Sequence, residues 1–257
     1  MPKFKLALFD LDGTLTTERS AWEYIHRRLG VWDGQAEKFQ QAYLRREISY
    51  DEFCRLDAAI WKGMKVSEVK AILGQIPLQP GAGELLAYLR EKGVRLGIIS
   101  SGLSFLSERI KEEFGFDYAV ANDLQTEDGI LTGGIRINVH YDQKAEWVED
   151  ARRIFHLDKE EIFAVGDSSG DIPMFRGCDF SIAFNCFSPG LEAVATVCIR
   201  TCDLRDLIPV LAPYLGPVEG TGRKPLVTEG PEITEPKIGS SFIPLPRPRG
   251  RGEGEGE

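Results

Sequence analysis

The sequence predicts an α/β fold built on a doubly wound parallel sheet. Three observations lead to this prediction: apolar β-rich runs alternate with amphipathic helical patterns, one helical insert interrupts the alternation, and the 257 residues suffice for a sizeable core. In such a sheet ligands bind beyond the carboxyl ends of the strands. Functional residues are therefore expected directly after predicted strands.

Five apolar runs are predicted strands, and three amphipathic segments between them are predicted helices. The strands are expected at residues 4–9, 94–99, 117–121, 162–165 and 180–183. The helices are expected at residues 83–92, 103–114 and 144–155. Residues 122–139 carry Asp128-Gly129 and Gly133-Gly134 between apolar stretches, a pattern that is typical of a β-hairpin.

Residues 18–76 break the alternation and predict a small all-helical cap inserted after the first strand. Their aromatic and apolar residues recur at helical spacing among many charges. Residues 1–17 and 77–216 are accordingly assigned to the core domain. Residues 217–257 contain seven prolines and eight glycines and are predicted to form a flexible tail, because they bury too little apolar surface to order.

The composition excludes several classes of protein and of partner. Hydrophobic residues make up 42% and charged residues 28% of the chain, which excludes collagen-like, wholly disordered and membrane-bundle proteins. The net charge of -9 repels phosphate backbones, so nucleic acid is not an expected partner. The apolar run near the start is too short for an export signal or a membrane span, which predicts a cytoplasmic protein with no membrane partner.

Two carboxylates directly follow the first predicted strand, in Asp10-Leu11-Asp12-Gly13-Thr14. A turn at this point aims Asp10 and Asp12 into one pocket. A carboxylate is able to attack phosphorus, and its neighbour is able to protonate the leaving oxygen and later to deprotonate water. The alternative is an acidic turn without chemistry.

A hydroxyl-rich turn and a lysine are candidates for holding a phosphoryl group. Ser100, Ser101 and Gly102 follow the second predicted strand and precede a helix, where hydroxyl and N–H groups form an oxyanion cradle. Serine is also the ordinary residue at a helix start, so this turn alone is a weak signal. Lys144 opens the helix before the next strand and offers a fixed cation, although a single helical lysine is usually a solvated charge.

Two further carboxylates, Asp167 and Asp171, follow the strand at residues 162–165 in the segment Gly166-Asp167-Ser168-Ser169-Gly170-Asp171. Oxygen ligands at this spacing suit a hard cation such as Mg²⁺. Such a cation lowers the repulsion between Asp10 and an incoming phosphate. The alternative is a solvated acidic turn.

Taken in order, the segments DLDGT, ISSG, Lys144 and GDSSGD resemble the four motifs of the haloacid dehalogenase superfamily of phosphohydrolases. The resemblance spans residues 4–211, and the helical insert resembles the C1-type cap of that superfamily. Within it, the sequence is most similar to the phosphoserine phosphatase branch. The resemblance implies a Rossmann-like core and a Mg²⁺-dependent phosphomonoesterase that works through an aspartyl-phosphate.

The resemblance also implies a role for each motif residue. Asp10 would be the nucleophile, and Asp12 the general acid and base. Mg²⁺ would bind a side-chain oxygen of Asp10, the backbone carbonyl of Asp12 and the carboxylate of Asp167. Ser100, Ser101 and Lys144 would bind the phosphoryl group, with Gly102 beside them. Asp171 would contact the metal ligands, and the alternative is that Asp171 binds the metal directly. Because a halide leaves without a proton, an acid at Asp12 favours ester hydrolysis over dehalogenation.

The substrate implied by the resemblance is O-phosphoserine, a small phosphate ester. Arg55 would bind its carboxylate, since a guanidinium fork suits that group. Glu18 would bind its amine. The alternatives are a phosphatase for a sugar or nucleotide phosphate, and a phosphate-binding scaffold without catalysis. The sequence gives no prediction of the oligomeric state.

Overall fold

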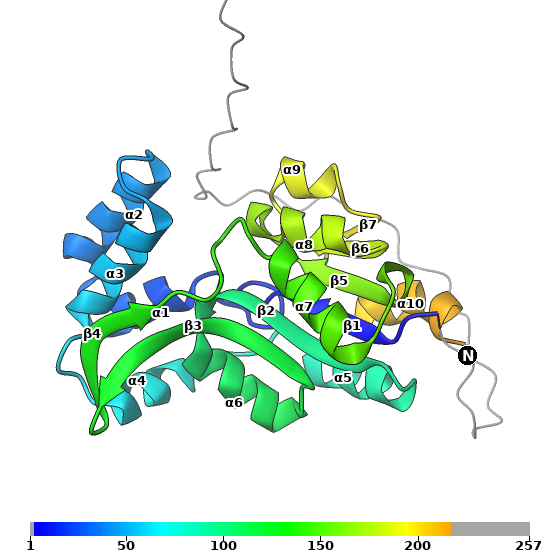
Figure 1. Cartoon of the computed structure of the whole chain (residues 1–257), viewed down its shortest axis with the longest axis horizontal. Helices are drawn as coiled ribbons and strands as arrows, with labels where there is room; N and C mark the ends of the chain where they lie inside the picture. The colour runs from blue at the N-terminus through cyan, green and yellow to red at the C-terminus, as the bar shows by residue number, and fades with distance from the viewer. Residues whose placement is uncertain (1–2, 217–257) are drawn as a thin grey trace, which may run out of the picture. The chain divides into compact units, whose positions relative to one another are not determined.

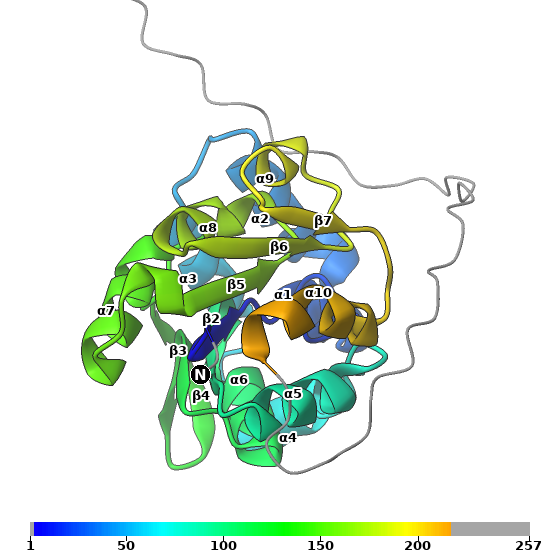
Figure 2. The same cartoon turned by 90° about the vertical axis from the view of Figure 1, so that its right-hand side faces the viewer.

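The computed structural model describes residues 3–216, which contain one seven-stranded sheet with helices on both faces (Figures 1 and 2). The strands are β1 (Leu6–Phe9), β2 (Arg95–Leu103), β3 (Tyr118–Glu127), β4 (Ile130–Arg136), β5 (Ile162–Gly166), β6 (Phe180–Phe184) and β7 (Val197–Ile199). Their order across the sheet is β4-β3-β2-β1-β5-β6-β7, and only the β3–β4 pair is antiparallel. The predicted doubly wound α/β fold is therefore confirmed, with a sheet that is mostly parallel.

The alternation of side chains along the strands produces two hydrophobic layers. In β1, Ala7 and Phe9 belong to one buried cluster, whereas Leu6 and Leu8 belong to a second cluster on the other face. The first layer includes residues of α5 (Ala82–Glu91), α6 (Ser104–Phe114) and α10 (Leu207–Leu215). The second includes residues of α7 (Ala145–Phe155), α8 (Ile172–Gly177) and α9 (Pro189–Glu192). Both faces of the central strands are buried, as their near-continuous apolar sequences predict.

Two strands extend at least four residues beyond their predicted ends, and one strand was not predicted. β2 continues to Leu103 after a register shift that begins at Ile99. The predicted turn at residues 100–102, called the serine-rich turn below, therefore lies in an irregular extension of the strand. β3 continues into the predicted hairpin with β4, and the turn residues Asp128 and Gly129 both have positive φ, at 49° and 78°. β7 has three residues, which is too short for a periodic signal.

The predicted helical cap follows β1 and is confirmed. It consists of α1 (Ala21–Arg28), a π-helical turn η1 (Trp32–Ala36), α2 (Glu37–Leu44), α3 (Tyr50–Ile60) and α4 (Val66–Leu73). Stacked rings of Trp22 and Trp61, with centroids 5.4 Å apart, lie in its apolar interior. The domain limits assigned from the sequence stay a prediction.

The segment between α3 and α4 is bound to the β3–β4 hairpin. Gly63 N donates to the Leu131 carbonyl over 2.8 Å, and Leu131 N donates to the Met64 carbonyl over 2.8 Å. Val66 N donates to the Gly129 carbonyl over 2.9 Å. These bonds pair part of the open edge of β4 and fix the base of the cap to the sheet.

The predicted tail, residues 217–257, lies outside the described residues. Among residues 3–216, the helices are all too short or too polar to cross a membrane.

Candidate active site

The sheet brings three predicted segments to one edge. Phe9 of β1 pairs with Ile98 of β2 on one side and with Val165 of β5 on the other. The backbone N–H of Asp10 continues this pairing and donates to the Val165 carbonyl over 2.9 Å. Since all three strands are parallel, the residues that follow them emerge at the same carboxyl edge.

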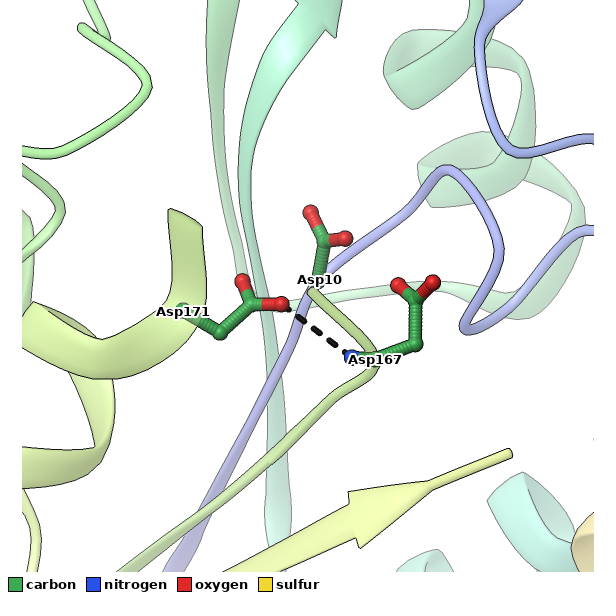
Figure 3. A group of neighbouring side chains, drawn as sticks. All are labelled: Asp10, Asp167 and Asp171. Atoms are coloured by element: carbon green, nitrogen blue, oxygen red, sulfur yellow. Dashed lines mark hydrogen bonds between the residues drawn. The ribbon is translucent and has the colours of Figure 1, made fainter. Parts of the chain in front are cut away.

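Three buried carboxylates meet at this edge. One oxygen each from Asp10, Asp167 and Asp171 lies within 4.8 Å of the others. Figure 3 shows Asp10 between Asp171 and Asp167, with the Asp167 N–H donating to Asp171 Oδ2 over 3.1 Å. The three side chains come from β1 and from the turn after β5, which are separated by more than 150 residues of sequence.

Lys144 supplies a positive charge to this cluster. Its side chain is only 2% exposed at the start of α7, and its Nζ donates to Asp10 Oδ1 over 2.6 Å and to Asp171 Oδ1 over 2.7 Å. Burial lowers the pKa of Lys144, but attraction by the two carboxylates outweighs burial and raises the pKa above its ordinary value. Lys144 is therefore a fully charged, buried bridge between β1 and the turn after β5.

Asp171 organises the turn after β5. Its Oδ1 accepts from Lys144, and its Oδ2 accepts from the backbone N–H of Asp167 and of Ser168 and from the Ser168 hydroxyl, over 3.0–3.2 Å. Both oxygens are thus engaged within the protein. This bonding pattern holds the backbone from which the Asp167 side chain projects.

The cluster has more negative than positive charge. Burial, followed by the charge of Asp171, raises the pKa of Asp10 to about 6. Burial, followed by the charge of Asp10, raises the pKa of Asp167 well above its ordinary value. Buried carboxylates with raised pKa values favour an additional cation, and an all-oxygen donor set fits a hard ion such as Mg²⁺.

Asp12 lies beside this cluster and against Gly102. Burial, followed by the charge of Asp10, raises the pKa of Asp12 to about 7. Its Oδ1 is buried and has no hydrogen-bond partner within residues 3–216. A Cβ atom at Gly102 would overlap the Asp12 carboxylate, so glycine at this position lets the Asp12 side chain lie directly against the backbone of residue 102.

The serine-rich turn is fixed by the cap and by β3. The buried Ser100 hydroxyl accepts from the Gly102 N–H over 2.9 Å. The Ser101 carbonyl accepts from the Tyr50 hydroxyl of α3 and from Asn122 Nδ2, both over 2.9 Å. The turn therefore forms a contact between the core and the cap at the candidate site.

Gly102→Ala tests whether the close approach to Asp12 matters. The added methyl would displace the Asp12 carboxylate and would lie 3.1 Å from Ser100 Oγ. We expect kcat/KM for an aryl phosphate to fall about 10²-fold, because small misplacements of a reacting group are costly.

A matched variant is Gly83→Ala in α5, where the nearest atom to the added Cβ is 3.8 Å away. We expect this variant to keep full activity. Full activity of Gly102→Ala would show that the position of Asp12 against Gly102 is unimportant.

Four residues near the site carry no predicted role. Thr14 Oγ1 donates to Asp167 Oδ1 over 3.1 Å, and Arg19 Nη1 donates to Asp167 Oδ2 over 2.7 Å. Tyr50 and Asn122 hold the Ser101 carbonyl, as described above. The position of Thr14 inside the DLDGT segment was a signal for it. The other three lie in ordinary charged or polar sequence, and only the fold brings them to the site.

The two predicted substrate-binding residues of the cap lie in different environments. Glu18 is half-buried, and its charge contributes to the raised pKa of Asp12. The Arg55 side chain is 65% exposed, and its Nη2 lies 3.2 Å from Asp51 Oδ2 on the same helix. The predicted role of Arg55 stays a prediction.

Comparisons with known proteins identify the family of this chain. The family model for haloacid dehalogenase-like hydrolases matches residues 7–176. A phosphoserine phosphatase of Methanocaldococcus jannaschii is 32% identical over 207 residues, which cover 80% of this chain and 97% of that protein. One from Archaeoglobus fulgidus is 35% identical over 182 residues, covering 70% of this chain and 52% of its own length, so this match spans about half of that relative.

A solved structure has the same fold. It is a phospho-aspartyl intermediate analogue of a phosphoserine phosphatase, with a TM-score of 0.71 and 31% identity. The similarity covers 81% of this chain and 99% of that one.

Proposed function

Because this chain belongs to the haloacid dehalogenase-like hydrolase family and is a phosphoric monoester hydrolase, we propose that it hydrolyses O-phosphoserine through an aspartyl-phosphate on Asp10. The main support for this proposal is the buried contact of Lys144 with Asp10 and Asp171, with Asp167 beside them. A carboxylate nucleophile and a fixed cation at one strand end are the parts that covalent phosphoryl transfer requires. The named relatives support phosphoserine as the substrate.

We propose that Mg²⁺ is the cofactor and that three groups hold it: a side-chain oxygen of Asp10, the backbone carbonyl of Asp12 and the carboxylate of Asp167. The raised pKa values of Asp10 and Asp167 support this assignment, because a bound cation stabilises the charged carboxylates against the burial and the mutual repulsion that raise those pKa values. Asp171 is not assigned as a ligand, since both of its oxygens already accept bonds from the chain. When bound, the ion neutralises charge on the phosphoryl oxygens.

In the first proposed step, Lys144 and Ser100 hold the phosphoryl oxygens, with Ser101 at the same turn. A carboxylate oxygen of Asp10 attacks phosphorus, and the bond from phosphorus to the serine oxygen breaks. Protonated Asp12 gives its proton to that oxygen, so serine leaves as a neutral alcohol. A pKa of about 7 for Asp12 supports this role, because both of its protonation states are then populated near neutral pH.

In the second proposed step, water hydrolyses the aspartyl-phosphate. Asp12, now a carboxylate, takes a proton from the attacking water. The new bond joins the water oxygen to phosphorus, and the bond from phosphorus to Asp10 breaks. Inorganic phosphate leaves, and both aspartates return to their starting states.

We further propose that residues 1–17 and 77–216 carry out the chemistry while the cap, residues 18–76, governs substrate choice. The hydrogen bond from Tyr50 of the cap to the Ser101 carbonyl supports this division, since it couples the cap to the serine-rich turn that is proposed to hold the phosphoryl oxygens. Closure of the cap over the site would exclude water during the attack by Asp10.

A panel of phosphate esters tests the proposed function. O-phosphoserine, a hexose phosphate, a nucleoside monophosphate and an aryl phosphate are compared with Mg²⁺ and with a chelator. We expect the highest kcat/KM for O-phosphoserine, loss of all hydrolysis with the chelator and recovery when Mg²⁺ is restored. A higher kcat/KM for the sugar or nucleotide ester would identify that ester, and not O-phosphoserine, as the substrate. Activity that survives the chelator would show that Mg²⁺ is not the cofactor.

A further inference from the structure

Arg19 is a charged side chain at the candidate site that the mechanism above does not use. Its Nη1 donates to Asp167 Oδ2 over 2.7 Å, and its Nη2 donates to the Asn185 carbonyl over 2.8 Å. Its guanidinium also lies over the ring of Phe187, 4.7 Å from the centroid. With a side chain only 27% exposed, Arg19 is held at the edge of the carboxylate cluster by two separate loops.

We propose that Arg19 is a specificity-determining residue, which binds a carboxylate on the leaving group of the substrate after the cation has taken Asp167. This inference rests on the proposed function, because it assumes that phosphoryl transfer takes place at Asp10. The guanidinium already binds a carboxylate oxygen, that of Asp167, and a substrate carboxylate would take the same donor. Its planar pair of donors suits a carboxylate better than the single charge of a lysine.

The bond from Arg19 to Asp167 is exchangeable in this proposal. Asp167 Oδ1 accepts from Thr14 and Oδ2 accepts from Arg19, so a cation that binds Asp167 competes with Arg19 for the same group. Two positive charges at one carboxylate repel each other. The contacts with the Asn185 carbonyl and with Phe187 do not involve Asp167, and they keep the released guanidinium at the edge of the site.

Arg19 also lies on the appropriate side of the nucleophile. Lys144, which is assigned to the phosphoryl group, contacts Asp10 and Asp171, whereas Arg19 contacts Asp167. In the view of Figure 3, Asp171 and Asp167 are on opposite sides of Asp10. Arg19 is thus placed to bind a group other than the phosphoryl oxygens.

Arg55, which the sequence resemblance assigns to the substrate carboxylate, lies in a more exposed environment than Arg19. Arg55 is 65% exposed and forms an ion pair with Asp51, one turn earlier on α3. An exposed ion pair of this kind contributes little free energy to holding the side chain in place. The contact of Arg19 with Asp167 makes Arg19 the stronger candidate.

The test compares pairs of esters that differ in the carboxylate. The pairs are O-phosphoserine with O-phosphoethanolamine, and phosphoglycolate with ethyl phosphate. We expect the wild-type enzyme to prefer the carboxylate-bearing member of each pair. Arg19→Gln should reduce that preference about 10- to 100-fold, the usual effect of losing one charged hydrogen bond. The matched variant Arg27→Gln, which removes a 56% exposed arginine of α1, should keep it.

A second readout is independent of turnover. Isothermal titration of Mg²⁺ into the metal-free protein should show about two- to fivefold tighter binding for Arg19→Gln than for wild type, because one competing ion pair is gone. Unchanged or weaker Mg²⁺ binding by Arg19→Gln would show that Arg19 and Mg²⁺ do not compete for Asp167.

The remaining outcomes separate this inference from the proposed substrate. If O-phosphoserine is not hydrolysed but Arg19→Gln abolishes the preference for phosphoglycolate, the substrate is wrong and the role of Arg19 stands. If O-phosphoserine is hydrolysed and Arg19→Gln retains the full preference in both pairs, the role of Arg19 is overturned. Loss of the preference in Arg55→Gln alone would assign the carboxylate to Arg55 instead.

Discussion

Asp10→Asn is expected to lower kcat for O-phosphoserine and for an aryl phosphate by at least about 10⁴-fold, the scale found when a covalent nucleophile is removed. The amide has nearly the shape of the carboxylate but does not attack phosphorus. Lys144 keeps its second partner, Asp171, so the fold should persist. The measurement is steady-state kinetics with saturating Mg²⁺, together with denaturant unfolding of both proteins.

The matched variant is Asp33→Asn, which makes the same chemical change at an exposed position of η1. It should retain wild-type kcat. If Asp10→Asn hydrolyses the aryl phosphate at the wild-type rate, Asp10 is not the nucleophile. If it loses activity only because it is unfolded, the denaturation curve reveals this, and Asp10→Glu then serves as the second variant.

Lys144→Met has the second large expected effect, on stability as well as on activity. It removes the buried cation that lies 2.6 Å from Asp10 and 2.7 Å from Asp171 and leaves both carboxylates without it. Breaking a buried ion pair by removing one partner costs about 3–5 kcal/mol. We expect the free energy of unfolding in metal-free buffer to fall by that amount, and turnover to be lost.

Two further variants make the stability result interpretable. Lys111→Met, at an exposed position of α6, should change the free energy of unfolding by less than about 0.5 kcal/mol. The double variant Lys144→Met/Asp171→Asn should recover part of the loss, because one of the two stranded charges is removed. Wild-type stability of Lys144→Met would contradict the buried ion pair that the structure contains.

The parts of the site that could be predicted are those encoded locally. Asp10 and Asp12 follow a strand of four buried apolar residues, and Asp167 follows another of five. An apolar run that ends in carboxylates indicates both the strand and the edge where its ligands lie. The parallel order of the sheet then follows from the alternation of strands and helices.

The parts that could not be predicted depend on contacts between distant segments. Arg19 and Asp167 are 148 residues apart, and nothing in the sequence around Arg19 distinguishes it from a surface charge. Asn122 is completely buried and bonds to Ser101 and to residues 138–139, but a single asparagine in a hairpin arm is also common on a surface. The pairing of residues 63–66 with β4 likewise arises from packing and has no periodic signal.

The exposure of Arg55 illustrates a second limit of sequence patterns. Helical spacing indicates which residues of α3 share a face, but it does not indicate which face points toward the site. Tyr50 and Arg55 lie on the same helix, yet only Tyr50 bonds to the serine-rich turn, while Arg55 is paired with Asp51.

A covalent bond from Asp10 to phosphorus is the step on which the rest of the proposed mechanism depends. Acid quenching of the Mg²⁺-loaded enzyme during turnover of O-phosphoserine radiolabelled in its phosphoryl group, followed by peptide mapping, detects such a bond. We predict label on the peptide that contains Asp10, and release of that label by hydroxylamine, as for any acyl-phosphate. Label on a different peptide, or turnover with no labelled protein at any quench time, would show that Asp10 does not form this bond.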